Sequence, residues 1–293
     1  MEVHTTIAGF RRALDAGRGA GHRVGLVPTM GSLHAGHVSL VEQAAAENDV
    51  VAVSIFVNPL QFGAGEDLES YPRTLDRDTG LVEEAGATHL FAPSVEEMYP
   101  EPMRTAVSVS DVGELLEAAS RPTHFAGVAT VVAKLFSIAG PCRSYFGEKD
   151  FQQLAVVRRM ATDLSMPVEV VGCPTVREPD GLALSSRNVY LNAEQRAAAP
   201  VLHRALRTGA SLVLSGERHA QVVRRAMAET VSGEPSARLD YAEAVDAGTL
   251  ERVDPLDGDL RLLVAARFGR TRLIDNVGVL ADRSHQAPPA SSM

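Results

Sequence analysis

Two histidines, His34 and His37, stand three residues apart in the segment PTMGSLHAGH (28–37). An apolar run at 22–28 precedes them and an Ala/Val/Leu-rich stretch at 38–47 follows, which predicts a strand, a loop and a helix. The histidines would then lie at the amino end of the helix, where free N–H groups and a partial positive charge favour phosphate oxygens. Imidazoles there could also donate hydrogen bonds to a triphosphate and to the charge that builds on a leaving pyrophosphate.

The glycines of this segment, Gly31 and Gly36, would let the backbone approach a phosphate closely. Taken alone, the four letters HAGH fit a glycine-containing turn with two exposed histidines better. The sequence has no GxxxxGK[ST] loop, no GxGxxG and no His-Glu-x-x-His. A metal-binding pair remains open, although no third ligand stands out.

Lysine is rare in this chain: of its 28 cationic residues, only Lys134 and Lys149 are lysines. A lysine is therefore a candidate for a place where a compact ammonium matters, because the planar guanidinium of arginine cannot replace it in a tight site. Lys134, inside an apolar stretch, is as well explained by codon bias. Lys149 has the stronger case, because it follows a predicted strand in FGEKDFQQL (146–154).

The elements that must position these residues alternate between strand and helix. Strands are expected at 22–28, 50–58, 88–93, 143–147 and 167–174, and helices at 38–47, 74–85, 126–138 and 150–165. This alternation predicts an α/β fold, a doubly wound, Rossmann-like parallel sheet whose ligands bind at the carboxyl ends of the strands.

The pattern changes after Val176. Helical segments at 193–214 and 219–231 precede strand-like segments at 237–245, 260–268 and 271–279, which predicts a smaller α+β domain. We therefore expect a Rossmann-like ligand-binding domain at 1–175, a smaller α+β lid domain at 176–280 and a disordered tail at 281–293.

Composition limits the class of protein. The chain has 293 residues, 45% of them hydrophobic, so we expect a globular protein. Its net charge of −9 gives no overall electrostatic attraction to nucleic acid, so we expect no nucleic-acid partner. No apolar run is long enough for a membrane span, and the first residues do not look like a secretion signal. Cys142 and Cys173 form no zinc or disulfide pattern, which fits the reducing cytoplasm.

Five segments in this order resemble the pantoate–β-alanine ligase family, of the HIGH-loop nucleotidylyltransferase superfamily. They are PTMGSLHAGH, SIFVNPLQFGAGEDLESYPRTLDRD, RPTHFAGVATVV, FGEKDFQQL and VREPDGLALSSRN. The resemblance runs from the first predicted strand to about residue 192, and more weakly through RLLVAARFGRTRLIDN. It implies ATP-dependent condensation of (R)-pantoate with β-alanine to pantothenate through a pantoyl adenylate, with release of pyrophosphate and AMP, by a homodimer.

The resemblance also assigns roles to residues of this chain. His37, His34 and Lys149 would be catalytic, with His37 as proton donor or transition-state stabiliser and Lys149 beside the α-phosphate. Gln61, Gln153 and Asn58 would bind pantoate or β-alanine, although Asn58 could simply end its strand. The ATP-binding set would be Met30, Gly31, Ser32, Leu33, His34, Ala35, Gly36, His37, Gly147, Glu148, Lys149, Asp150, Val176, Leu184, Ser185, Ser186 and Arg187.

Some assignments stay open. Asp150 could equally cap its helix. Mg²⁺ is expected with ATP, and Asp78 is the candidate protein ligand, but Arg77 stands where some relatives carry an acid, so we favour a solvated helix start there. Side chains that could line or gate the site are Tyr71, Arg73, Arg121 and His124.

Other functions are compatible with parts of the pattern. Another HIGH-loop nucleotidylyltransferase would keep HAGH and SSR but would not explain VNPLQF together with FGEKDFQQL. A non-catalytic nucleotide sensor would bind ATP without turnover. A tRNA synthetase is disfavoured because the acidic chain has no obvious tRNA-binding extension.

Overall fold

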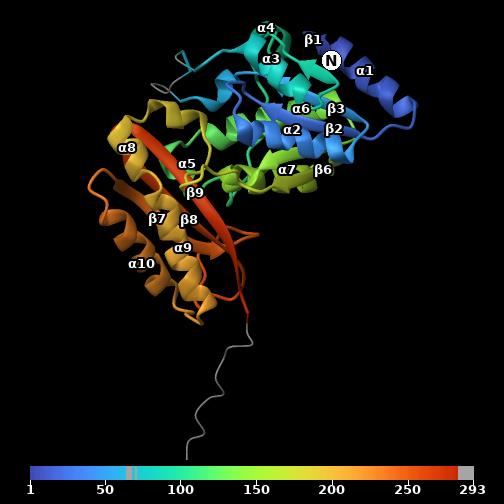
Figure 1. Ribbon diagram of the computed structural model, residues 1–293. Helices are drawn as coiled ribbons and strands as arrows, with labels where there is room; N and C mark the ends of the chain where they lie inside the picture. The colour runs from blue at the N-terminus through green and yellow to red at the C-terminus, as the bar shows by residue number, and fades with distance from the viewer. Residues whose placement is uncertain (64–67, 70, 283–293) are drawn as a thin grey trace, which may run out of the picture. The chain divides into compact units, whose positions relative to one another are not determined.

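The structure, a computed structural model, describes residues 1–63, 68–69 and 71–282. These residues form two compact units (Figure 1). The first unit comprises Met1–Val176 and Leu184–Ser186, and the second comprises Arg177–Ala183 and the chain from Arg187 onward. The sequence placed the boundary between 175 and 176, but it did not anticipate that Leu184–Ser186 groups with the first unit.

The first unit contains a parallel sheet with the strand order β1-β4-β3-β2-β5-β6. The almost continuously apolar β2 and β3 are central and buried, as expected of parallel strands covered on both faces. The strands are β1 (Glu2–His4), β2 (Val24–Thr29), β3 (Val50–Ile55), β4 (His89–Phe91), β5 (Cys142–Gly147) and β6 (Val168–Cys173).

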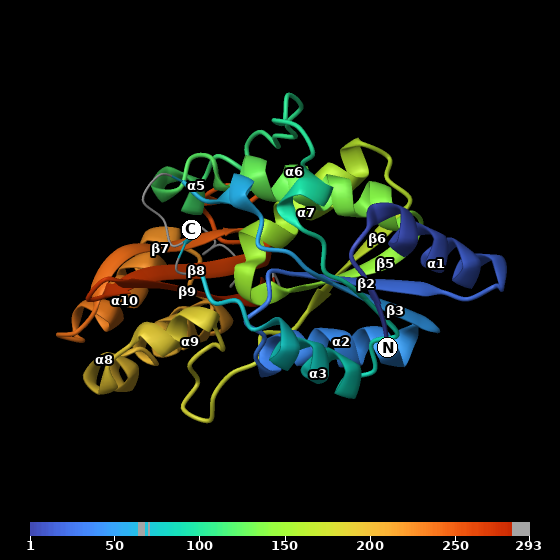
Figure 2. The same cartoon turned by 90° about the horizontal axis from the view of Figure 1, so that it is seen from above.

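Helices cover both faces of this sheet (Figure 2). On one face, α6 (His124–Ala139) packs against α1 (Ile7–Gly19) and α7 (Phe151–Asp163). On the other face, α2 (Ala35–Glu47) packs against α3 (Leu75–Glu84). The short elements are α4 (Val95–Met98), α5 (Glu117–Ser120) and the 3₁₀ turns η1 (Pro59–Gln61), η2 (Glu148–Asp150) and η3 (Ser186–Tyr190).

The second unit is a three-stranded antiparallel sheet with helices packed on it. Its strands are β7 (Arg238–Asp246), β8 (Gly258–Phe268) and β9 (Thr271–Ala281), and its helices are α8 (Ala193–Ala198), α9 (Val201–Leu214) and α10 (Ala220–Ser232). The α+β prediction is confirmed. The single helical segment predicted at 193–214 is wrong in detail, because the chain breaks into α8 and α9 at Pro200, which offers no N–H to continue a helix.

A buried ion pair holds the first segment of the second unit. Both guanidinium nitrogens of Arg177 donate to the Asp275 carboxylate, at 2.6 and 2.9 Å, and Asp275 is 3% exposed. Arg177 also donates to the carbonyl oxygens of Gly181 and Asn276. The segment 177–183 is thereby fastened to β9 by a two-pronged, charge-assisted contact.

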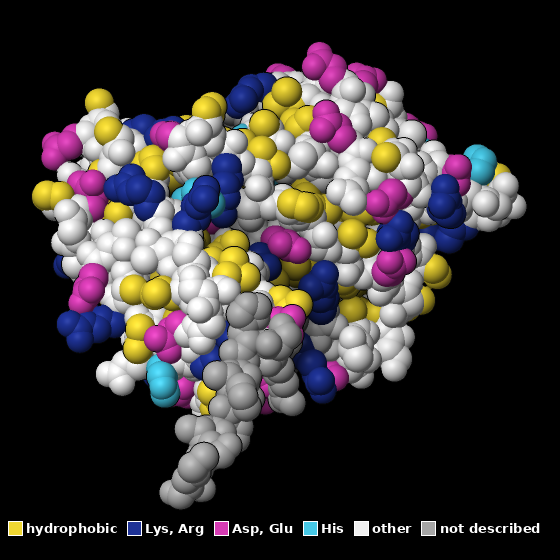
Figure 3. Space-filling model, turned by 60° about the horizontal axis from the view of Figure 1, so that its bottom comes forward, with side chains coloured by type: hydrophobic (Ala, Val, Ile, Leu, Met, Phe, Trp, Pro, Cys, Tyr) yellow, Lys and Arg dark blue, Asp and Glu magenta, His cyan; other side chains and the backbone are white. Residues whose placement is uncertain are grey.

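The doubly wound α/β fold predicted from the sequence is confirmed, although β1 and α1 were missed. The predicted tail starts too early, because Ala281 is 2% exposed at the end of β9, and residues 283–293 lie outside the described part of the chain. No described helix is long and apolar enough to cross a membrane. On the face drawn in Figure 3, acidic and basic side chains are intermixed, and no large basic field is seen there.

Candidate active site

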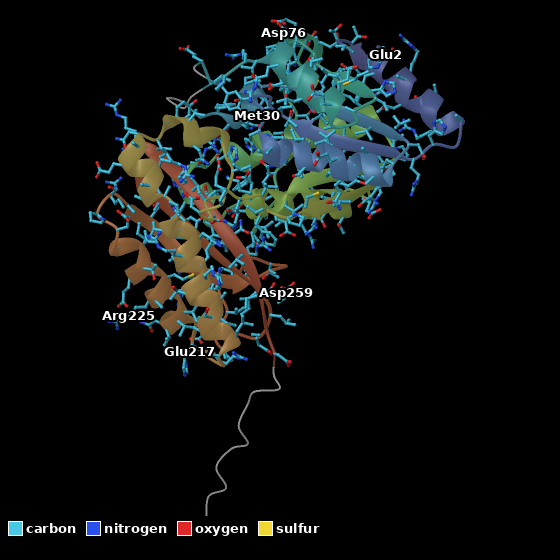
Figure 4. All side chains as sticks on the ribbon, viewed as in Figure 1. Glu2, Met30, Asp76, Glu217, Arg225 and Asp259 are labelled. Atoms are coloured by element: carbon cyan, nitrogen blue, oxygen red, sulfur yellow. The ribbon has the colours of Figure 1, made fainter. Side chains whose placement is uncertain are left out.

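Three predicted functional segments follow three neighbouring strands. The loop with His34 and His37 follows β2, the turn with Gln61 follows β3, and the turn with Lys149 follows β5. The chain leaves β2 for β3 on one side and later returns to β5 on the other, so β2 and β5 flank the topological switch point of the sheet. Ligands of open α/β sheets bind at this point, beyond the carboxyl ends of the strands. Met30 stands just beyond the end of β2 (Figure 4).

The first loop is shaped by a reciprocal cap at the start of α2. His34 is the N-cap residue, and its ring Nδ1 accepts a hydrogen bond from the Gly36 N–H at 3.1 Å. The His37 Nδ1 accepts from the His34 N–H at 3.4 Å, and the two rings lie 4.1 Å apart between centroids. A Cβ at residue 36 would lie 2.9 Å from the His34 ring, so only glycine lets the ring cover the helix start.

This geometry fixes how the two imidazoles can act. Because each Nδ1 accepts a hydrogen bond, the proton of the neutral ring is on Nε2 in both cases. Burial lowers the pKa of His34 to about 4, with a further lowering by Lys149 and an opposing effect of Asp150. Burial, then His34, lowers the pKa of His37 to about 3; Asp150 opposes this shift, and Lys149 adds a smaller lowering. Both rings are therefore neutral donors at pH 7 in the ligand-free protein.

The same pKa shifts show that the β5 turn faces the histidines, because Lys149 and Asp150 act on both rings. The Lys149 ammonium lies 3.5 Å from the Asp150 carboxylate, and its side chain is 18% exposed. Asp150 makes no side-chain cap of α7, so the capping role considered for it is wrong. The structure thus brings together an ammonium and two imidazoles that the sequence placed more than 100 residues apart.

Asp78 serves as an anchor for the histidine loop. Its carboxylate is 0% exposed and accepts hydrogen bonds from the N–H groups of Ser32 at 2.7 Å and Leu33 at 3.0 Å. The Thr74 hydroxyl donates to it at 3.1 Å. Gly31 and Ser32 have positive φ angles of 83° and 53°, so the carboxylate stabilises a backbone that would otherwise be strained.

The preferred sequence interpretation of Asp78, a solvated helix start, is therefore wrong. Asp78 also does not fit the alternative of a magnesium ligand, because both of its oxygens accept hydrogen bonds from the protein and neither is accessible. Mg²⁺ prefers several carboxylate, phosphate or water oxygens around it. Asp76, in the first turn of α3 (Figure 4), is the other acid of this segment.

Asn58 lies behind Gln61 and orients it. The Asn58 amide nitrogen donates to Gln61 Oε1 at 3.1 Å and to the Gly127 carbonyl at 3.2 Å. Its oxygen accepts from the Tyr99 hydroxyl at 2.8 Å and from the Leu60 N–H at 3.2 Å. All four hydrogen-bonding positions of this 1% exposed amide are thus filled by the protein. Asn58 therefore positions Gln61, although the sequence analysis grouped Asn58 with the substrate contacts.

Gln61 is held at both its side chain and its backbone. Its side-chain nitrogen lies 2.8 Å from the sulfur of Met30, next to the histidine loop. Its carbonyl accepts hydrogen bonds from the His124 ring at 3.0 Å and from Arg121 at 3.3 Å. Of the residues expected to line or gate the site, His124 and Arg121 thus fix the turn that carries Gln61.

Gly127 lets α6 approach this turn without a side chain between them. A Cβ at residue 127 would lie 2.2 Å from the Leu60 carbonyl oxygen and 2.6 Å from the Gln61 Cα. Both obstacles are backbone, so neither can move aside alone. The remaining two gating candidates also have structural contacts, since Tyr71 packs on Phe62 and Arg73 donates to the Tyr71 carbonyl.

The two adjacent glutamines of α7 differ in their roles. Gln152 is buried, its nitrogen donates to the carbonyls of Val112 and Leu115, and its oxygen accepts from the Glu117 N–H. Gln153 is partly exposed, and no hydrogen bond joins its side chain to another described residue. Its amide is therefore available to a ligand, and its contact with pantoate stays a prediction.

Of the last predicted segment, VREPDGLALSSRN, only a part belongs to the first unit. The Leu184 N–H donates to the Val176 carbonyl at 3.0 Å, and the Leu184 Cβ lies 3.8 Å from where a Cβ at Gly36 would be. Ser185 and Ser186 belong to the same unit, whereas Arg187 belongs to the second unit. Leu184 is thus beside the start of α2, and the phosphate contact of Arg187 stays a prediction.

Sequence reasoning missed four supporting residues: Tyr99, Gly127, Gln152 and the anchoring role of Asp78. A glycine inside an apolar helix costs about 1 kcal/mol relative to alanine, so Gly127 could have been suspected of a packing role. Lys134, left undecided, donates to the Met98 carbonyl and lies 5.3 Å from the centre of the Tyr99 ring. Its ammonium therefore supports the residue that contacts Asn58.

Comparison with known proteins decides the family. Residues 2–278 match the family described as pantoate-beta-alanine ligase. The chain belongs to the pantoate–β-alanine ligase family. It is 57% identical over 277 residues to the pantothenate synthetase of Chloroflexus aurantiacus, with 94% of this chain and 97% of that protein covered. It is 54% identical over 285 residues to the pantothenate synthetase of Sinorhizobium medicae, with 97% and 98% covered.

Solved structures of ligases of this family share the fold. The pantothenate synthetase of Thermus thermophilus superposes with a TM-score of 0.90 at 53% identity, over 96% of this chain and 100% of that chain. The pantoate-beta-alanine ligase of Francisella tularensis, complexed with beta-gamma ATP and beta-alanine, superposes with a TM-score of 0.77 at 33% identity, over 94% and 97%. The resemblance drawn from the five sequence segments is confirmed.

Proposed function

We propose that this chain catalyses the ATP-dependent condensation of (R)-pantoate with β-alanine to give pantothenate, AMP and pyrophosphate. The observation that carries the proposal is the meeting of His34, His37 and Lys149 at the switch point of the sheet, beside the oriented amide of Gln61. Membership of the pantoate–β-alanine ligase family and the ligand-bound ligase of Francisella tularensis also support the proposal.

The donors at the start of α2 suit the phosphates of ATP. Two neutral imidazoles each present an Nε2–H, and the helix N-terminus adds a partial positive charge. The Lys149 ammonium belongs beside the α-phosphate, where a compact charge can follow the developing negative charge. A bound triphosphate would raise the pKa of both rings, which makes His37 a stronger donor once ATP is in place.

The first chemical step forms pantoyl adenylate. A carboxylate oxygen of pantoate attacks the α-phosphorus, the bond from this phosphorus to the bridging oxygen of the β-phosphate breaks, and pyrophosphate leaves with the bonding electrons. The enzyme supplies positioning and charge stabilisation, with Gln61 and Gln153 as amide partners of pantoate. The Gln61 amide is set for this by Asn58, whose own contacts are all within the protein.

The second step transfers the acyl group. The neutral amine of β-alanine attacks the acyl carbon, the bond to the adenylate oxygen breaks, AMP leaves, and the amine loses one proton. Gln61 contacts Met30 of the histidine loop, which supports the proposal that Gln61 also contacts the amine.

Mg²⁺, which usually accompanies ATP, is proposed to be held by phosphate oxygens and water rather than by Asp78. We also propose a homodimer in the cytoplasm, on the family resemblance, which sedimentation or light scattering would test. The activity itself is tested by measuring AMP formation from ATP with pantoate and β-alanine supplied separately and together. Full turnover should need both, and a nucleotide sensor would form no AMP with any combination.

A further inference from the structure

A second cluster of metal-ligating side chains lies at the edge of the parallel sheet. Glu2 and His4 are on the edge strand β1, two residues apart, so their side chains point to the same face. His89, on the neighbouring strand β4, pairs in register with Glu2. The parallel pairing of β1 with β4 therefore gathers one carboxylate and two imidazoles on one side of the edge.

The ligand atoms of the cluster already face one another. His4 Nε2 lies 3.2 Å from His89 Nδ1. Glu2 places one carboxylate oxygen 3.7 Å from His4 Nε2 and the other 3.9 Å from His89 Nδ1. Zinc binds imidazole nitrogen at about 2.0–2.1 Å, so two nitrogens at a tetrahedral angle are roughly 3.3 Å apart. The observed nitrogen separation matches this value, and the carboxylate needs only a small inward movement.

The surroundings also suit a cation. His4 is buried and its ring packs against Phe10 at 5.8 Å between centroids, which holds the ligand in place. Glu2 is exposed and leaves a side open to water for a fourth ligand. The nearby N-terminal ammonium is paired with Glu83 at 2.8 Å.

We propose that Glu2, His4 and His89 bind one zinc-like divalent transition-metal ion, which fastens the edge strand β1 to β4. The donor set of two imidazole nitrogens and one carboxylate oxygen is one that zinc accepts with an added water. When the ion binds, the proton between the two facing nitrogens moves to the other nitrogen of its ring, so both lone pairs reach the metal.

This site is separate from the proposed ATP chemistry. β1 and β2 are three strand positions apart in the sheet, which corresponds to about 14 Å at a strand spacing of roughly 4.8 Å. Figure 4 labels Glu2, on β1, and Met30, the residue after β2. The ion would therefore stabilise the edge of the sheet and would not enter the reaction.

The test is a titration of the tag-free, chelator-treated full chain with Co²⁺, followed by its visible absorption, and with Zn²⁺, followed by calorimetry. We expect one ion per chain at this site and at least a tenfold weaker affinity in His89→Gln. Two further variants separate loss of the site from general damage to the fold. His22→Gln, at an exposed histidine, should bind the ion as the wild type does. Glu2→Gln, which leaves the core intact, should bind the ion more weakly.

Thermal melts give the second readout. Zn²⁺ should raise the melting temperature of the wild type and of His22→Gln, and should have little effect on His89→Gln. The proposal is overturned if His89→Gln and Glu2→Gln bind Zn²⁺ as the wild type does, or if the wild type binds none. It is equally overturned if binding is lost in His37→Gln but kept in His89→Gln, because the ion would then occupy the loop after β2.

Discussion

Replacing Gly127 by alanine tests how α6 positions Gln61. The added Cβ would lie 2.2 Å from the Leu60 carbonyl oxygen and 2.6 Å from the Gln61 Cα. Ordinary contacts between such atoms are about 3.5–4.0 Å, so helix and turn must separate by roughly 1 Å or more. That movement would also stretch the 3.2 Å hydrogen bond from Asn58 to the Gly127 carbonyl.

The expected loss of stability follows from two opposing effects. Overpacking a core costs about 1–3 kcal/mol, and the upper end applies here because the obstacles are backbone. Alanine gains about 0.8–1.0 kcal/mol over glycine inside a helix. The net loss in the free energy of unfolding should be about 2 kcal/mol, and the KM for pantoate should rise severalfold because Gln61 is displaced.

Gly80 is the matched control, because it lies inside α3 and a Cβ there would meet nothing within 4 Å. Gly80→Ala should be as stable as the wild type or slightly more stable, with unchanged KM for pantoate. Urea unfolding and initial-rate kinetics on both variants provide the measurements. If Gly127→Ala is as stable and as active as Gly80→Ala, the direct packing of α6 on the η1 turn is not what holds Gln61.

Four further substitutions or conditions probe the rest of the site. Asp78→Asn should lower the free energy of unfolding by about 3 kcal/mol and reduce kcat, because one of two backbone donors would face an amide N–H instead of a carboxylate; unchanged urea midpoint and kcat would refute the anchor. Gln153→Ala should raise the KM for pantoate with unchanged stability, whereas the neighbouring Gln152→Ala should mainly lower stability; the reverse result would exchange their roles. Lys149→Arg should lose nearly as much kcat/KM as Lys149→Ala, and an active arginine variant would contradict the need for a compact ammonium. Because burial lowers the pKa of His37 to about 3, the stability that depends on its neutral ring is complete above pH 6.5 and is lost as the pH falls towards 3. In His37→Gln the free energy of unfolding should therefore fall less steeply between pH 6.5 and pH 3. The same pH dependence in the variant and the wild type would contradict the lowered pKa of His37.

The sequence predicted the first unit well because its signals are local. β2 and β3 are short apolar runs that end at polar, glycine- or proline-containing loops, and this pattern needs no distant partner to be recognised. It also located His34, His37 and Lys149 in the segments that follow strands. Pro200 was the one local signal that was overlooked in the second unit.

Roles that depend on distant contacts could not be predicted. Asn58 looked like a ligand residue, but its amide is filled by Tyr99 and Gly127, which are 41 and 69 positions away. Asp78 looked like a solvated acid, but it receives the backbone N–H groups of a loop 45 positions earlier. Both side chains carry the chemical groups of a binding site, and only their partners show that they position other residues.

The most direct test of the proposed function is isotope exchange between pyrophosphate and ATP in the absence of β-alanine. If His34, His37 and Lys149 support attack of the pantoate carboxylate on ATP, labelled pyrophosphate should enter ATP whenever pantoate is present. Exchange should disappear without pantoate and fall by on the order of 10²–10³ in His37→Ala, the usual effect of losing one transition-state donor. Exchange that requires β-alanine, or that proceeds without pantoate, would contradict the adenylate mechanism.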